Sequence, residues 1–123
     1  MSAPEIKLGF VENIFTRMMH FANVGDIEQG HTHDHDHVTV LSSGSLEVTV
    51  DGIATEFNAP QLIFISQGKK HQLKALSANT VIVCVHALRD DDGMVLSPDM
   101  VPQQGEELSR VLKATRNRED ESV

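Results

Sequence analysis

Apolar and polar residues alternate along much of this chain, and that pattern predicts β-strands. The clearest case is 45–50, where Leu46, Val48 and Val50 fall on one face and polar residues fall on the other. Similar short segments recur between turn-forming residues. We expect one or two strands between Phe10 and Phe21 and further strands at 38–41, 45–50, 53–57, 62–65 and 81–85. Strands spaced this closely predict an all-β domain, either a sandwich or a barrel.

The C-terminal quarter has a different pattern. Residues 97–105 are irregular, whereas apolar residues recur at helical spacing within 105–116, and this stripe is expected to pack on the barrel or across a dimer. The stripe consists of Leu108, Val111, Leu112 and Thr115. Residues 116–123 are mostly charged and are expected to fray. The sequence therefore predicts one domain, with the barrel over 1–104 and a short C-terminal helix and tail over 105–123.

Size and composition narrow the class of protein. The chain has 123 residues, enough for one domain with a buried core. Its net charge of −8 and its lack of Trp and Tyr argue against a general nucleic-acid partner. Cys84 is the single cysteine, so no internal disulfide forms and a reducing cytoplasm is the expected location. We expect no signal peptide, and no apolar run approaches the ~18 residues that a membrane helix needs.

Four histidines alternate with small polar residues in the segment HTHDHDH; they are His31, His33, His35 and His37. Along one straight strand, residues 31 and 37 would lie about 20 Å apart. One metal ion cannot join them at that distance, because metal–nitrogen bonds are about 2.1 Å long. The four side chains therefore do not share one ion unless the chain bends. The alternative is an exposed histidine-rich tract that binds metal weakly.

A bend is expected in the middle of this segment. Asp34 and Asp36 favour a turn. We therefore expect one strand to end with His31 and His33 and the next strand to begin at His37. His35 would then lie at the turn and point elsewhere.

The spacing of these residues resembles the first motif of the cupin superfamily. That motif runs Gly, five residues, His-x-His, three or four residues, Glu, six residues, Gly. This chain has Gly25, His31, His33, His37 and Gly44 at those positions. The single difference is His37 in place of Glu.

The second cupin motif is matched in part. It runs Gly, five residues, Pro-x-Gly, two residues, His, three residues, Asn. Gly68 and His71 fit it, whereas Pro60, Ser66 and Ala75 stand where Gly, Pro and Asn are usual. The two motifs together cover about residues 25–75. The resemblance implies a double-stranded β-helix, or jelly-roll, barrel.

The resemblance also implies one divalent metal ion in the mouth of the barrel. Its ligands, carried over by position, are His31, His33, His37 and His71. Most cupins use three His and one Glu, so this chain is similar to the less common all-histidine members. Those members include manganese and iron proteins, and cupins without the Glu include several dioxygenases. Iron or manganese is therefore favoured, with nickel and zinc as alternatives.

Four neutral imidazoles leave the charge of the metal uncompensated, which favours an anionic or chelating oxygen ligand. On an octahedral ion they would leave two positions for a chelating substrate, or for substrate and O₂. We therefore expect a metal-dependent, dioxygenase-like oxidoreductase that acts on a small enol, diketone or keto acid.

Other functions and the oligomeric state also follow from the resemblance. The alternatives are a non-catalytic module that senses or stores a small ligand, and a metal-dependent isomerase or lyase acting on a sugar or keto acid, because one fold hosts many functions. A homodimer is expected, because small cupins are commonly dimers and a short barrel leaves sheet edges to cover.

The remaining histidines and the cysteine have structural interpretations. His20 and His86 match no motif and are expected to be hydrogen-bonded structural residues. Cys84 lies in the apolar segment 81–85 and is expected to be a core thiol.

A few polar residues are candidates for positions around the metal. Thr39 and Gln72 are candidates to lie near it and hold its ligands, whereas the two aspartates of the turn are expected to face water. Lys69 and Lys70 form a solvated turn or steer an anion toward the mouth. No catalytic acid or base is assigned.

Overall fold

The computed structural model describes residues 2–31, 37–65, 70–90, 92 and 94–101, with the backbone alone at 29–31, 37 and 65. The strands are β1 (Glu5–Val11), β2 (Ile14–Phe21), β3 (Ile27–His31), β4 (His37–Ser43), β5 (Ser45–Val50), β6 (Ile53–Asn58), β7 (Gln61–Ile65), β8 (His71–Ala75) and β9 (Thr80–Ala87), followed by the 3₁₀ helix η1 (Pro98–Met100). They form a five-stranded sheet in the order β1-β2-β9-β4-β7 and a four-stranded sheet in the order β3-β8-β5-β6. The paired strands are antiparallel.

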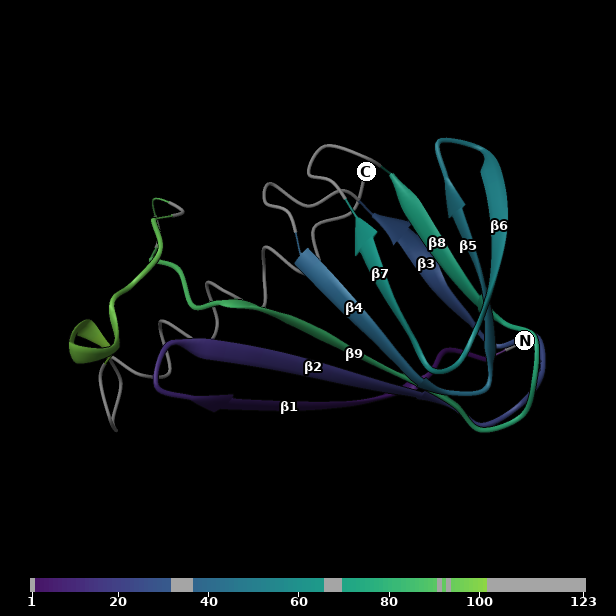
Figure 1. Cartoon of the computed structure of the whole chain (residues 1–123), viewed down its shortest axis with the longest axis horizontal. Coiled ribbons are helices and arrows are strands. Elements are labelled where there is room, and N and C mark those ends of the chain that lie inside the picture. The colour runs from purple at the N-terminus through teal and green to yellow at the C-terminus, as the bar shows by residue number, and fades with distance from the viewer. Residues whose placement is uncertain (1, 32–36, 66–69, 91, 93, 102–123) are drawn as a thin grey trace.

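The chain crosses from one sheet to the other at nearly every step (Figure 1). Among the described strands after β2, only the hairpin of β5 and β6 keeps two consecutive strands in one sheet. The crossings place strands that are distant in sequence next to each other, such as β2 with β9 and β4 with β7. This winding is the topology of a double-stranded β-helix, so the predicted all-β barrel is confirmed.

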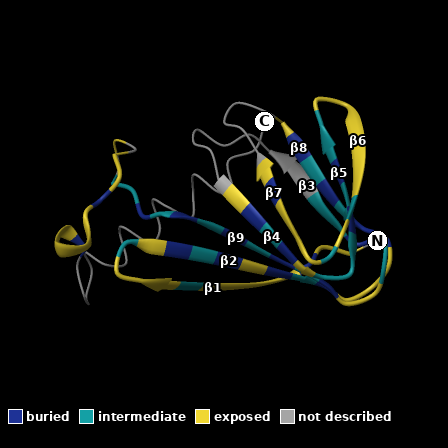
Figure 2. Ribbon diagram, viewed as in Figure 1, coloured by how far each residue is buried: buried dark blue, intermediate teal, exposed yellow. Residues whose placement is uncertain are grey.

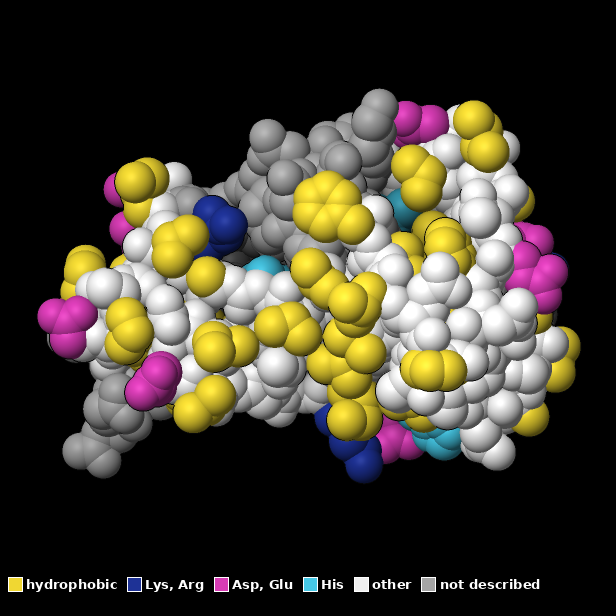
Figure 3. All heavy atoms as spheres, viewed as in Figure 1, with side chains coloured by type: hydrophobic (Ala, Val, Ile, Leu, Met, Phe, Trp, Pro, Cys, Tyr) yellow, Lys and Arg dark blue, Asp and Glu magenta, His cyan; other side chains and the backbone are white. Residues whose placement is uncertain are grey.

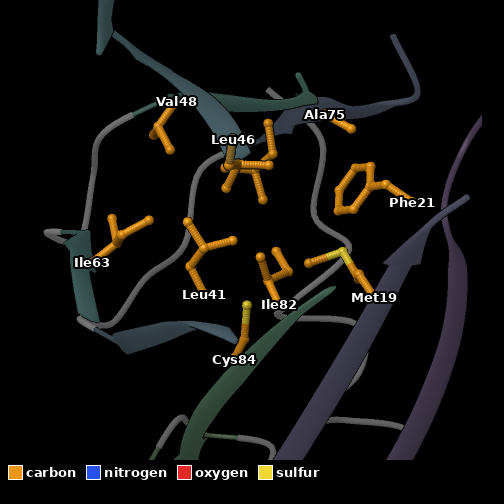
Figure 4. Packing of buried hydrophobic residues seen from close by; sticks show 10 residues of the cluster. Met19, Phe21, Leu41, Leu46, Val48, Ile63, Ala75, Ile82 and Cys84 are labelled. Atoms are coloured by element: carbon orange, nitrogen blue, oxygen red, sulfur yellow. The ribbon is translucent and has the colours of Figure 1, made fainter. Parts of the chain in front are cut away.

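Apolar side chains fill the space between the two sheets. Buried and less buried residues alternate along β2 (Figure 2), and Met19 and Phe21 are among the buried ones. The main core consists of Met19, Phe21, Leu41, Leu46, Val48, Ile63, Leu73, Ala75, Ile82 and Cys84. These side chains come from both sheets and point toward one another (Figure 4). Because burying one such large side chain stabilises a fold by about 1.5–3 kcal/mol, this cluster holds the sheets face to face.

A smaller apolar cluster lies where β2 begins and β9 ends. It joins Phe15 on β2 to Leu88, Leu96 and Val101, which follow β9. The side-chain amide of Asn13 donates to the carbonyl oxygen of Leu96 over 2.8 Å. The segment after β9 is therefore fixed against the inner face of β2, and the described chain ends on that side of the sheet.

Most predicted strands are present close to their expected bounds. Segment 10–21 contains the end of β1 and all of β2, and Cys84 is a core residue at 3% exposure, as expected. Most of β1, whose side chains are largely exposed, and all of β8, which has only five residues, were not predicted from the sequence. The predicted helix at 105–116 and the tail lie outside the described residues. Within the described part, no helix has the length and apolar character needed to cross a membrane.

Gly44 forms a tight corner between β4 and β5. Its backbone is left-handed, with φ +83°. A Cβ at this position would fall on Oγ1 of Thr80 and within 2.8 Å of Thr80 Cα. The hydroxyl of Thr80 also donates to the carbonyl oxygen of Ser77 over 2.9 Å. Only glycine fits such a close approach, which explains the glycine that ends the first motif.

Asp26 binds the N-terminal residue Ser2 at the end of the barrel that includes Gly44. Its carboxylate accepts hydrogen bonds from Ser2 Oγ at 2.8 Å and from the backbone N–H of Asn23 at 3.1 Å. The hydrogen bond from Ser2, followed by that from Asn23, holds the pKa of the Asp26 carboxyl below its ordinary value of 3.8.

We expect Gly44→Ala to destabilise the fold more than Gly52→Ala. Both glycines have φ +83°, so each substitution costs about 1–2 kcal/mol of backbone strain. A Cβ at Gly52 would meet nothing within 4 Å, whereas one at Gly44 adds an overpacking cost of about 1–3 kcal/mol. Urea unfolding of both variants measures the difference, and equal losses would contradict the close approach to Thr80.

The stability supplied by Asp26 should depend on pH. Because its folded pKa is lowered, the ionised carboxylate stabilises the fold above the unfolded value, and that contribution is lost as the pH falls through the folded pKa. Asp26→Asn should therefore unfold at lower urea than wild type at pH 7, and the gap should narrow as the pH falls below about 3.8. The exposed Asp92→Asn serves as control. A gap that stays constant with pH would contradict this role.

Candidate metal centre

Two strand pairings bring distant parts of the histidine pattern to one end of the barrel. β3 ends at His31, the register partner of His71, with which β8 begins. β4 begins at His37, the register partner of Ile65, with which β7 ends. Short connections link β3 to β4 and β7 to β8 across the two sheets, so these four strand ends lie together (Figure 1). We call this end of the barrel the mouth.

The register of β3 against β8 shifts by one residue on the way to the mouth. Ile27 pairs with Lys74 and Glu28 pairs with Leu73, but His31 then pairs with His71. Continued without a shift, the register would oppose position 31 to Lys70. An irregularity of this kind inserts one extra residue into a strand. It is the feature that makes positions 31 and 71 partners.

The described residues cover part of the predicted ligand set. The predicted strand end near His31 and strand start at His37 are both present. His33 and His35 lie outside the described residues, as do Asp34, Asp36 and Lys69. His71 is the one predicted ligand whose side chain is described. Among the side chains that the structure describes, no three His, Cys, Asp or Glu groups lie close enough together to hold a metal.

His71 is buried, with 3% exposure. β8 lies between β3 and β5, and His71 has Val50 as its register partner on β5. Burial alternates along β8, with His71, Leu73 and Ala75 buried and Gln72 on the other face. Of the two residues proposed to lie near the metal, Gln72 is therefore turned away from the interior.

The five-stranded sheet contributes His86 to the wall of the mouth. This histidine is 8% exposed, and its ring centroid lies 5.2 Å from that of Phe15. Its Nδ1 lies 3.1 Å from the carbonyl oxygen of Ala87, which favours a proton on Nδ1 and makes Nε2 the acceptor nitrogen. The preceding residue, Val85, is the register partner of Val38, so His86 lies beside the start of β4.

His86 is the residue near the mouth that sequence reasoning did not place. It is buried and hydrogen-bonded, as a structural histidine would be, but no motif indicated its position. The available signal was the alternation of buried residues along β9, which continues from Ile82 and Cys84 to His86. His20 is also hydrogen-bonded as expected, with its Nε2 2.9 Å from Oδ1 of Asn79 near the other end of β2.

One row deeper, polar side chains cross the barrel. Arg17, Cys84 and Thr39 are register partners on β2, β9 and β4. Nη2 of Arg17 lies 3.4 Å from Oε1 of Glu28 on β3, and the two side chains are 5% and 15% exposed. Oγ1 of Thr39 lies 3.4 Å from Sγ of Cys84. The ion pair therefore joins the two sheets just below the mouth and neutralises the charge of Glu28.

The interior changes from polar to apolar along the barrel. His71 and His86 lie near the mouth, the ion pair of Arg17 and Glu28 follows, and the apolar core lies beyond it. A buried ligand finds its directional polar contacts in such a polar section. The mouth is therefore the candidate site in this fold.

Solved structures match this fold, although no protein-family model and no curated protein matches the sequence. KdgF from Halomonas sp. has a TM-score of 0.60 and 19% identity, over 72% of this chain and 83% of that chain. A conserved protein with a double-stranded β-helix domain from Klebsiella pneumoniae has a TM-score of 0.60 and 22% identity, over 69% and 76%. A cupin-2 domain containing protein from Shewanella frigidimarina has a TM-score of 0.58 and 15% identity, over 71% and 83%.

Identities of this size carry information about the fold alone. The fold is nevertheless specific, because several of the matched proteins are cupins or have a double-stranded β-helix domain. Their similarity agrees with the alternation of this chain between two antiparallel sheets. The chain therefore has a double-stranded β-helix fold, like the cupin proteins among these structures.

Proposed function

We propose that this chain is a metal-dependent, dioxygenase-like oxidoreductase that acts on a small substrate chelating through oxygen. One divalent ion, iron or manganese by preference, would be held by His31, His33, His37 and His71. The observation that most supports this proposal is the register of β3 and β8, in which His31 and His71 are partners at the end where His37 begins β4.

The donor set fits such an ion. Imidazole is a ligand for iron, nickel, copper and zinc, and geometry and availability then select the metal. Positions paired across antiparallel strands lie on one face of a sheet with Cβ atoms about 4.5–5.5 Å apart. Positions 31 and 71 are therefore within reach of one ion. When bound, a divalent ion without a carboxylate ligand supplies uncompensated positive charge that binds and polarises an anionic oxygen ligand.

Residues around the mouth suit an anionic ligand. Arg17 lies 3.4 Å from Glu28, so the negative charge of Glu28 is balanced within the barrel. Nε2 of His86 is an acceptor while Nδ1 keeps its proton, and the ring of Phe15 packs beside it. His86 and Phe15 would therefore line the side of the mouth that the five-stranded sheet forms.

A binding module without catalysis is the second candidate. Several polar side chains near the mouth already have partners: Arg17 with Glu28, and Thr39 with Cys84. A module that only binds and orients a ligand needs no catalytic acid or base. Reaction with oxygen separates the two candidates.

Removal of His71 tests the metal site. His71→Ala should lower the metal content of the purified protein and weaken Mn²⁺ binding by more than about tenfold, because even loss of a residue that only supports a ligand costs 10–100-fold. His20→Ala is the matched control, since His20 is hydrogen-bonded to Asn79 far from the mouth. Elemental analysis and titration calorimetry provide the readouts. If the His71 variant keeps wild-type metal content and affinity, the metal site is wrong.

Oxygen consumption tests the reaction class. The iron-loaded protein is titrated without air against a panel of small enols, diketones and keto acids and is then exposed to oxygen in an electrode cell. At least one ligand that binds should cause oxygen uptake above that of the protein or ligand alone. Binding without uptake across the panel would favour the binding module and contradict the oxidoreductase.

A further inference from the structure

A shallow hollow lies on the outer face of the five-stranded sheet, away from the mouth. It is lined by Glu5, Lys7, Met18, His20 and Val81, which belong to β1, β2 and β9. Figure 3 shows basic, acidic and histidine side chains close together at the lower border of a group of hydrophobic side chains. None of these residues belongs to the metal site proposed above, so the hollow needs an account of its own.

The hollow brings a thioether and an imidazole together. Buried and less buried residues alternate along β2, which places Met19 in the core and leaves Met18 and His20 on the outer face. Residues two apart on a strand lie about 6.6 Å apart along it, because each residue adds ~3.3 Å. Met18 is 41% exposed, and its unbranched side chain has three rotatable bonds. Its sulfur is therefore able to approach the imidazole closely enough for one ion to contact both.

Asn79 orients the ring of His20 and selects its tautomer. Nε2 of His20 lies 2.9 Å from Oδ1 of Asn79. Because an amide oxygen only accepts hydrogen bonds, Nε2 carries the proton of the neutral ring and donates it. Nδ1 is then the nitrogen whose lone pair is suited to a metal. Histidines that bind metals usually donate their other ring N–H to an oxygen in this way.

The charged residues of the hollow offset each other. Glu5 and Lys7 are the register partners of His20 and Met18, and Lys7 Nζ lies 3.8 Å from Glu5 Oε1. The hollow therefore has little net charge with which to attract an anion or to compensate a divalent ion. Among the side chains described here, no three His, Cys, Asp or Glu groups are clustered to hold such an ion. The donor set fits an ion that is soft and singly charged.

We propose that the hollow binds Cu(I) through Sδ of Met18 and Nδ1 of His20. Thioether ligands select Cu(I), whereas Mn²⁺ prefers carboxylate and carbonyl oxygens. A single positive charge needs no carboxylate ligand, and Cu(I) accepts low coordination numbers. The site is independent of the metal proposed at the mouth, so either proposal can fail without the other. For the same reason, His20→Ala remains a valid control for Mn²⁺ binding at the mouth.

Two other methionines provide an internal comparison. Met94 and Met100 are 65% and 61% exposed, which is more than Met18, but neither lines the hollow. If exposure of a thioether were sufficient, both would bind Cu(I) at least as tightly as Met18 does. Because the imidazole supplies a second donor only in the hollow, Met18 should bind Cu(I) more tightly than these two residues.

NMR of the methionine methyl groups in the full-length protein tests this site. The protein carries carbon-13 in those methyl groups and is titrated without air with Cu(I) supplied in acetonitrile. The Met18 signal, assigned as the one that is missing in Met18→Leu, should shift at lower Cu(I) than the signals of Met94 and Met100. Each methyl group reports Cu(I) at its own sulfur, so Cu(I) bound to histidines at the mouth does not produce this shift.

His20→Gln tests the second donor. Glutamine keeps an amide N–H for Asn79 but offers the metal no ring nitrogen. The Met18 signal should then need at least about tenfold more Cu(I) for the same shift, since loss of a residue that only supports a ligand already costs 10–100-fold. Met100→Leu is the matched control and should leave the Met18 titration unchanged. A Met18 signal that does not shift, that shifts only together with those of Met94 and Met100, or that titrates equally in His20→Gln would overturn the proposal.

Discussion

The antiparallel pairing of β3 with β8 is the constraint on which the mouth of this barrel depends. Its register begins with Ile27 opposite Lys74 and shifts by one residue before His31. Without the shift, position 31 would face Lys70, and the buried His71 would face position 30. Because side chains alternate between the two faces of a sheet, a shift of one residue in the pairing register changes which side chains of two neighbouring strands lie on the same face. A single irregularity in one short strand therefore decides whether two candidate ligands from distant parts of the sequence meet.

The same region also holds the two sheets together. The ion pair of Arg17 and Glu28 connects β2 to β3 one row below the mouth, and both side chains are largely buried. Removing one partner of a buried ion pair typically costs about 3–5 kcal/mol, because the other charge is left without compensation. The pair thus stabilises β3 just before its register shifts. The residues around the candidate site therefore also stabilise the barrel. At the opposite end of the barrel, Gly44 packs closely against Thr80 at the turn between β4 and β5.

Sequence reasoning identified the features that are local or tied to motif spacing. Alternation predicted β5, the turn signal after it predicted β6, and the need for a bend in the histidine segment predicted the start of β4 at His37. It could not predict which strands pair, because pairing depends on contacts far apart in the chain. The register shift in β3, the place of His86 beside the start of β4 and the ion pair of Arg17 with Glu28 all depend on such contacts. The hollow at Met18 and His20 was not predicted for the same reason, since it is lined by residues of β1, β2 and β9.

The central claim is that one metal ion binds at the mouth and that His71 is one of its ligands. Crystals of the protein grown with Mn²⁺ and measured by anomalous scattering test it most directly. The account predicts one strong anomalous peak for each chain, at the end of the barrel where β3 meets β8, within about 2.0–2.3 Å of a ring nitrogen of His71. A map with no peak there, or with manganese bound elsewhere while the His71 ring contacts only protein, would contradict it.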